Sequence, residues 1–117
     1  MKKILVVDDA EFMRNSLKLI LEGEDYEVIE AEDGYLAVKL YEQLKPDVVT
    51  MDINMPGKSG IDAIREIMDI DPSAKIVVIT AMGTEHMIRD AIQYGASNFI
   101  IKPFEDKQII EVVKKLV

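Results

Sequence analysis

The sequence predicts an α/β protein built on a doubly wound, five-stranded parallel sheet with five helices. Three observations support this prediction. Five short runs rich in Val and Ile recur along the chain, each is followed by a segment whose apolar residues repeat with the helical period, and turn or capping residues separate the segments. Strands that alternate with helices form parallel sheets, and their right-handed crossovers place helices on both faces.

The expected strands are short and apolar. The first, third and fourth are almost continuously apolar, which is typical of strands that are covered on both faces. We expect the strands at residues 3–7, 26–30, 47–51, 75–80 and 97–101.

Each expected helix presents an apolar stripe with steps of three and four residues. Pro46 and Pro72 stop the second and third helices, because the residue before a proline avoids the helical conformation. The stripes comprise Met13, Leu17, Ile20 and Leu21; Ala37, Leu40, Tyr41 and Leu44; Ile61, Ile64, Ile67 and Met68; Ile88, Ala91 and Ile92; and Ile109, Val112, Val113 and Leu116.

Capping residues mark the ends of these helices. We expect Asp33 to cap the second helix, and Ser59 the third with Asp62 in the capping-box position. Thr84 is expected to cap the fourth helix. Gly95 follows that helix, where a residue in the left-handed conformation is expected.

Length and composition exclude several classes of protein. The chain has 117 residues, the length of one domain, and no cysteine, which excludes disulfides and thiolate metal sites. The net charge of −8 argues against nucleic-acid binding, which depends on clustered Lys and Arg. The apolar run at residues 4–7 is shorter than the roughly 7–15 residues of a signal-peptide core, and no run approaches the roughly 18 residues of a membrane span. We therefore expect a cytoplasmic protein without membrane insertion.

Polar residues follow four of the five expected strands. Asp8 and Asp9 end the first strand, Asp52 ends the third, Thr80 ends the fourth, and Lys102 follows the fifth. Each of these residues alone is more typical of a helix cap, a turn or a solvated surface. Together they would occupy one edge of one sheet, and ligands of such sheets bind outside the carboxyl ends of the strands.

This combination indicates phosphoryl chemistry. If the first and third strands are neighbours about 4.8 Å apart, three carboxylates crowd together and raise each other's pKa unless a cation neutralises them. Oxygen ligands select Mg²⁺ or Ca²⁺ over Zn²⁺, and bound Mg²⁺ keeps waters that leave room for a phosphate oxygen. A metal ion, a hydroxyl and a lysine are the parts that phosphoryl transfer needs, and a carboxylate can be the nucleophile.

Four stretches of the chain resemble motifs of one known family. They are residues 6–9 (Val-Val-Asp-Asp), 51–57 (Met-Asp-Ile-Asn-Met-Pro-Gly), 78–81 (Val-Ile-Thr-Ala) and 101–104 (Ile-Lys-Pro-Phe), in the expected order and without a large insertion. The chain resembles the receiver domain of two-component response regulators, as one domain over residues 1–117. Chemotaxis regulators of this family are a standard example of the strand order 2-1-3-4-5, so the resemblance implies a flavodoxin-like fold with that order.

The resemblance also implies roles for the acidic residues. Asp52 matches the phosphoacceptor of the family. Asp9 and Asp52 would bind Mg²⁺ as the cofactor, with Asp8 acting mainly through water and Asn54 supplying its backbone carbonyl.

Further positions match the family's phosphoryl-binding and switch residues. Thr80, Ala81 and Lys102 would bind the phosphoryl group, Thr80 and Phe99 would be the switch residues, and the peptide bond before Pro103 would be cis. Two positions depart from related sequences: Phe99 stands where many chemotaxis regulators have tyrosine, and Met82 stands where some members have an acid or an amide.

The resemblance implies a monomeric signalling module rather than an enzyme. A histidine kinase would donate the phosphoryl group, and the face formed by the fourth helix, fifth strand and fifth helix would then bind a downstream protein. Residues 9–14 and 81–83 look most like stand-alone chemotaxis regulators, so that protein could be a flagellar motor or chemotaxis component. Two alternatives are a phosphorelay intermediate that passes the group to another histidine, and a magnesium-dependent phosphatase. The second is disfavoured because no acid stands two residues after Asp52.

Overall fold

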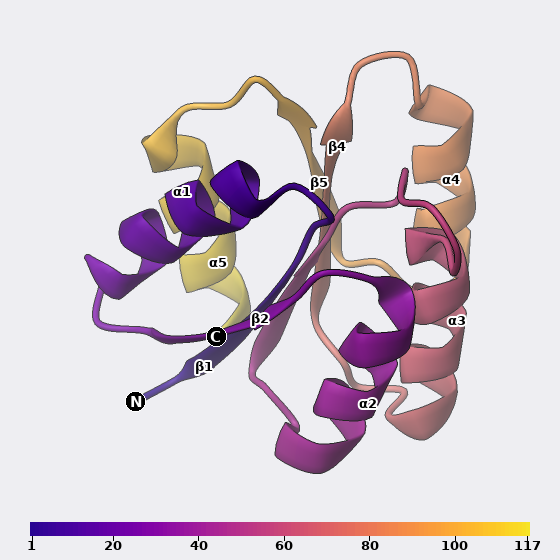
Figure 1. Cartoon of the computed structure of the whole chain (residues 1–117), viewed down its shortest axis with the longest axis horizontal. Helices are drawn as coiled ribbons and strands as arrows, with labels where there is room; N and C mark the ends of the chain where they lie inside the picture. Colours follow the sequence, from indigo (N-terminus) through magenta and orange to yellow (C-terminus); the bar gives the residue numbers. More distant parts are fainter.

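The computed structural model describes all residues from 1 to 117 and shows a five-stranded parallel sheet in the order β2-β1-β3-β4-β5 (Figure 1). The predicted fold class and strand order are confirmed, and every strand lies within one residue of its predicted bounds. The elements are β1 (Lys3–Val7), α1 (Glu11–Glu22), β2 (Glu27–Ala31), α2 (Gly34–Leu44), β3 (Val48–Met51), α3 (Gly60–Ile70), β4 (Ile76–Ala81), α4 (Glu85–Gln93), β5 (Asn98–Lys102) and α5 (Asp106–Leu116).

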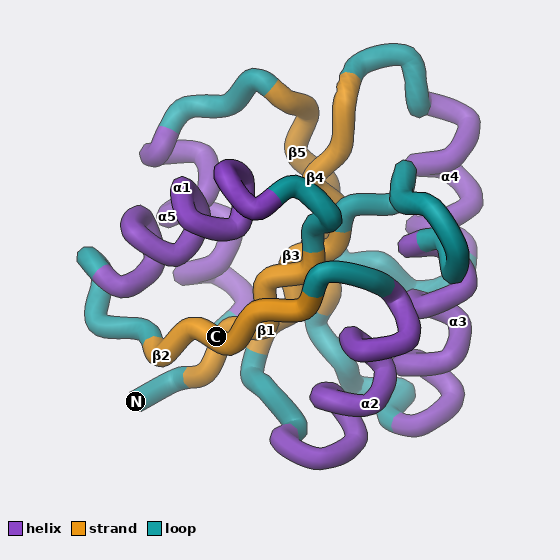
Figure 2. Tube along the Cα trace, in the orientation of Figure 1, coloured by secondary structure: helices purple, strands orange, loops and turns teal.

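Helices cover both faces of the sheet. Figures 1 and 2 show α1 and α5 on one face and α2, α3 and α4 on the other. Side chains alternate along a strand, so Leu5 and Val7 join the core under α2, α3 and α4, while Ile4 and Val6 join the core under α1 and α5. This explains why the central strands are apolar at every position.

The helix ends follow the expected capping residues with one correction. The side chain of Asp33 accepts a hydrogen bond from the Leu36 amide at 2.8 Å, and the Ser59 hydroxyl accepts one from Asp62 at 3.2 Å. Thr84 occupies the position before α4, but its hydroxyl donates to the Ala81 carbonyl at 2.7 Å and does not cap the helix. Its backbone dihedrals, φ −110° and ψ 21°, differ from the extended conformation that lets a side chain reach back to the helix.

Strand order reverses between β1 and β3, because the connection through α1 runs to β2 at one side and the chain then returns to the other side of β1. Val7 pairs with Met51, so β1 and β3 end at the same level. Residues 8 and 52 therefore emerge side by side at the point where ligands bind in folds of this kind.

None of the helices is long and apolar enough to cross a membrane.

Candidate functional site

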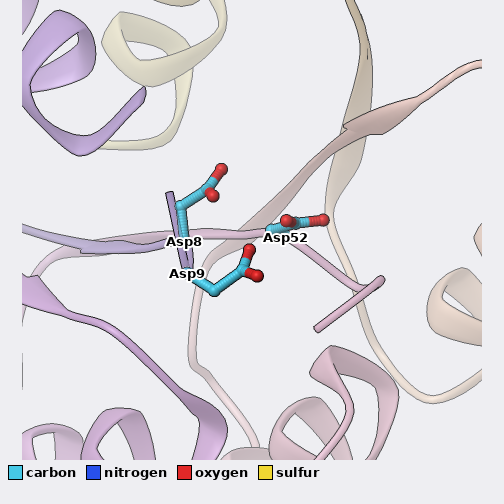
Figure 3. A group of neighbouring side chains, drawn as sticks. All are labelled: Asp8, Asp9 and Asp52. Carbon is cyan, nitrogen blue, oxygen red and sulfur yellow. The ribbon is translucent and has the colours of Figure 1, made fainter. Parts of the chain in front are cut away.

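Three carboxylates meet at the carboxyl edge of the sheet. Asp8 and Asp9 follow β1 and Asp52 follows β3, and one oxygen atom from each lies within 4.8 Å of the others (Figure 3). Asp8 and Asp52 are buried, with 1% and 6% exposure, whereas Asp9 is exposed. The sequence prediction that these side chains gather is confirmed.

Asp8 is held by hydrogen bonds at both carboxylate oxygens. Its Oδ1 accepts from the Ala10 amide at 2.9 Å, and its Oδ2 accepts from Lys102 Nζ at 2.8 Å. The Asp8 backbone N–H donates to the Ala31 carbonyl at 3.2 Å, which ties it to the end of β2. The Asp8 carboxylate is therefore held in place and already paired with the ammonium of Lys102.

Asp52 is less completely satisfied. Its Oδ1 accepts from the Asn54 amide at 3.1 Å, and Lys102 Nζ lies 3.7 Å from its Oδ2. Burial raises the pKa of the Asp52 carboxyl, the Asn54 amide and Lys102 oppose that rise, and the charges of Asp8 and Asp9 add to it. The carboxylate thus lies in an environment that favours an additional positive charge.

The residues present fit a divalent cation. Three carboxylates and one ammonium leave a formal charge of −2, which such an ion neutralises. All the donor atoms are hard oxygens, the ligands that Mg²⁺ and Ca²⁺ prefer. The Asp9 carboxylate makes no hydrogen bond or ion pair to the protein and so is free to be a ligand.

Thr80 and Lys102 complete the polar edge. Thr80 is fully buried at the end of β4, and its hydroxyl has no hydrogen-bond partner. The ammonium of Lys102, whose side chain is 20% exposed, reaches from the end of β5 to both Asp8 and Asp52. A carboxylate pair and an ammonium therefore meet at the edge where β4 delivers a buried hydroxyl, and these are the kinds of group that bind an anionic phosphoryl group.

Known proteins are similar to this chain along nearly its whole length. A profile of the response regulator receiver domain matches residues 4–114. Chemotaxis protein CheY of Thermotoga maritima is 53% identical over 116 residues, which cover 98% of this chain and 97% of that protein. Chemotaxis protein CheY of Bacillus subtilis is 49% identical over 114 residues, covering 97% of this chain and 95% of that protein.

The chain belongs to the response regulator receiver domain family. A solved structure of a CheY-like receiver domain protein from Methanospirillum hungatei agrees with this assignment: its TM-score is 0.94 at 27% identity, over 98% of this chain and 92% of that one. The chain is thus a receiver domain of two-component signalling, and its relatives include chemotaxis proteins.

Other predicted site residues of the receiver domain come from the loop after β3 and from the ends of β4 and β5. Asn54 and Ala81 are exposed, in the loop after β3 and at the end of β4. The peptide bond between Lys102 and Pro103 is cis. Phe99 is separate from the cluster: it is 44% exposed and lines a groove of about 460 Å³ between α4 and β5, together with Ile88, Ile92, Glu85, Arg89 and Ile101.

Gly60 belongs to the site although its role was not predicted from the sequence. A β-carbon at this position would lie 2.3 Å from the Asp52 carbonyl oxygen and 2.5 Å from the Ile53 Cα. Only glycine therefore lets the first turn of α3 pack directly against the backbone of Asp52. A glycine immediately after the capping residue Ser59 was the one available signal.

Proposed function

We propose that this receiver domain accepts a phosphoryl group on Asp52 from a histidine kinase, in a magnesium-dependent reaction, and so changes its affinity for a downstream protein. The observation that supports this most directly is the environment of Asp52. This buried carboxylate lies beside the acidic side chain of Asp9 and the ammonium of Lys102 at the switch point of the sheet, and the neighbouring strand β4 ends in an unpartnered hydroxyl.

The transfer is a displacement at phosphorus. An oxygen of the Asp52 carboxylate forms the new O–P bond while the P–N bond of the phosphohistidine breaks, and the bonding electron pair returns to the imidazole nitrogen of the donor. The hydrogen bond from the Asn54 amide to Oδ1 orients the carboxylate. Asp9, Asp52 and the Asn54 carbonyl would hold a Mg²⁺ ion, with Asp8 acting through water, and the bound ion would supply positive charge for the phosphoryl group.

Lys102 and Thr80 are the protein groups that would bind the transferred phosphoryl group, with Ala81 beside them. Lys102 Nζ already lies 2.8 Å from Asp8 Oδ2 and 3.7 Å from Asp52 Oδ2, so it can form an ion pair with the phosphoryl oxygens without a rearrangement of the backbone. The buried Thr80 hydroxyl lacks an acceptor, which a phosphoryl oxygen would provide.

The switch would connect Thr80 to the surface at β5. Movement of Thr80 toward the phosphoryl group vacates space behind β4, and Phe99 can turn from its exposed position into that space. The groove between α4 and β5 would change shape with it, because Phe99 forms part of the groove wall. A bias of a few kcal/mol is enough to shift such a two-state equilibrium.

We infer that the downstream protein is a chemotaxis component, such as a part of the flagellar motor. This inference rests on relatives named chemotaxis protein CheY that match this chain along nearly its whole length. A role as a phosphorelay intermediate would instead require the phosphoryl group to leave Asp52 for a second histidine.

Phosphotransfer tests this proposal. With Mg²⁺ present, incubation with acetyl phosphate should add one phosphoryl group to the native protein in a bond that hydroxylamine cleaves, and Asp52→Asn should remain unmodified. Stoichiometric labelling of Asp52→Asn would refute the assignment. Transfer from the labelled protein to a histidine phosphotransfer domain, without phosphorylation-dependent binding to a motor protein, would favour the phosphorelay role.

A further inference from the structure

The backbone of the two acidic residues after β1 is held by an arginine from α1. Arg14 Nη1 donates to the Asp8 carbonyl oxygen at 2.7 Å, and Arg14 Nε donates to Glu30 Oε1 at 3.3 Å. Glu30 belongs to β2 and also lies 3.9 Å from Lys18 Nζ. The Arg14 side chain is only 14% exposed, so the guanidinium connects the loop after β1 to the neighbouring strand in a partly buried setting.

The Asp8 carbonyl has no partner in the sheet. The last sheet hydrogen bonds at this end of β1 are made by two other backbone groups: the Val7 carbonyl accepts from the Asp52 N–H, and the Asp8 N–H donates to the Ala31 carbonyl. Hydrogen bonding within the sheet therefore ends at the Asp8 N–H, and the Asp8 carbonyl is bonded by the Arg14 side chain instead.

This carbonyl belongs to the peptide unit that joins Asp8 to Asp9. A peptide unit is planar, so a bond that fixes the Asp8 carbonyl also fixes the amide nitrogen of Asp9 and the direction of its Cα. The Asp9 carboxylate itself has no protein partner in the structure. Because no protein group restrains this side chain, the Asp9 backbone sets the point from which the carboxylate reaches the cluster.

We propose that Arg14 is a positioning residue of the magnesium site, which holds the Asp8–Asp9 peptide unit so that the Asp9 carboxylate faces Asp52. The inference rests on the metal site of the proposed function. Two different nitrogens of one planar guanidinium make the two bonds, so lysine, which offers a single nitrogen, cannot replace it.

Charge and geometry predict opposite effects at this position. Arg14 is a cation close to a cation site, so if only its charge mattered, replacing it by a neutral residue would strengthen magnesium binding. If it positions Asp9, the same replacement weakens binding. Groups that orient metal ligands from outside the ligand set typically contribute roughly 10- to 100-fold in affinity.

The test is a magnesium titration of the metal-free protein, followed through the amide NMR signals of Asp9, Asp52 and Asn54. Arg14→Met and Arg14→Lys should both lose about tenfold or more in affinity. Arg65→Met is the matched control, because it removes the same charge from an exposed site on α3, where Arg65 stacks on the Tyr94 ring at 4.9 Å; its affinity should equal that of the native protein.

A second measurement distinguishes positioning from general destabilisation. In the metal-free Arg14→Lys protein, amide hydrogen exchange should accelerate at Asp8 and Ala10, whose amides are bonded at this loop, and stay unchanged in β4 and α3. Uniformly faster exchange, or magnesium affinity that is unchanged or increased in Arg14→Met, would overturn the inference. If the variants bind as the native protein does, only the role of Arg14 falls; if the native protein itself binds no magnesium, the proposed metal site falls as well.

Discussion

Replacing Thr80 by valine should stabilise the resting protein and weaken its switch. The Thr80 hydroxyl is fully buried and unpartnered, and an unsatisfied buried hydroxyl costs roughly 1–3 kcal/mol. Valine has nearly the same shape and removes that cost, so the free energy of unfolding should rise by about 1–2 kcal/mol.

The expected change in melting temperature follows from the chain length. Unfolding entropy is about 2.1 cal/mol/K per residue, which gives roughly 0.25 kcal/mol/K for a chain of this size. A gain of about 1–2 kcal/mol therefore corresponds to a rise of about 4–8 °C in Tm. Thermal unfolding of the metal-free protein, followed by circular dichroism, measures it directly.

Thr50 supplies a matched control. Its hydroxyl is also buried and unpartnered, and it lies between Val6 and Val77 in the middle of the sheet. It alternates with Val49 and Met51, so it faces the opposite helix layer from them, under α1 and α5. Thr50→Val should raise Tm by a similar amount without affecting the switch.

The functional half of the prediction uses beryllofluoride, which stands in for the phosphoryl group on Asp52. In the native protein and in Thr50→Val it should shift the amide NMR signals of residues 82–95 and 97–104. In Thr80→Val, as in Thr80→Ala, these shifts should be much smaller although the ligand still binds. Equal shifts in all the proteins, or a loss of stability in Thr80→Val, would refute the reasoning about this hydroxyl.

Four further outcomes are expected. Asp9→Ala should abolish tight magnesium binding, measured by titration, while the metal-free fold gains stability because like-charge repulsion is relieved; unchanged affinity would contradict the ligand assignment. Asp52→Asn should stabilise the metal-free protein at neutral pH. The raised pKa of Asp52 means that the folded state binds protons more readily than the unfolded state, so the free energy of unfolding of the native protein falls as pH rises from the unfolded value of 3.8 through the folded pKa. Urea titrations in the presence of a chelator should show that the greater stability of Asp52→Asn disappears at lower pH. Gly60→Ala should lower the free energy of unfolding by more than about 2 kcal/mol, because its β-carbon would overlap the Asp52 backbone, and a neutral result would contradict the packing described. Tyr41→Phe should cost about 1 kcal/mol by removing the 2.7 Å bond from its hydroxyl to Asp71, as urea unfolding would show.

The fold could be predicted from the sequence because local signals agree with one another. Apolar runs end at Asp8, Asp52 and Thr80, and Asp33 and Ser59 cap helices as their spacing indicates. The strand order came from family resemblance instead, since hydrophobic period alone does not distinguish one arrangement of parallel strands from another. Registration of β1 against β3, which brings the carboxylates together, is a property of the sheet as a whole.

What could not be predicted depends on the three-dimensional path of the backbone, even where the residues in contact are close in sequence. The role of Gly60 follows from its close approach to the Asp52 backbone. The proposed role of Arg14 follows from its hydrogen bonds to the Asp8 carbonyl and to Glu30 on β2. Thr84 fits the capping pattern, yet its backbone conformation directs the hydroxyl to Ala81. In each case the residue type permits several partners, and only the three-dimensional path of the backbone selects one.

The unfavourable features of the resting protein gather where the proposed reaction would occur. Asp52 is a carboxylate whose pKa is raised by burial and by two neighbouring acids, and the Thr80 hydroxyl is buried without a partner. The two ligands of the proposed reaction would relieve them: a divalent cation would offset the excess negative charge, and a phosphoryl oxygen would accept a hydrogen bond from the hydroxyl. Because each ligand stabilises the state that it binds, the free energy released at this edge is available to shift Thr80 and Phe99. A site that was already satisfied in the resting state would bind the same groups with less effect on the surface at α4 and β5.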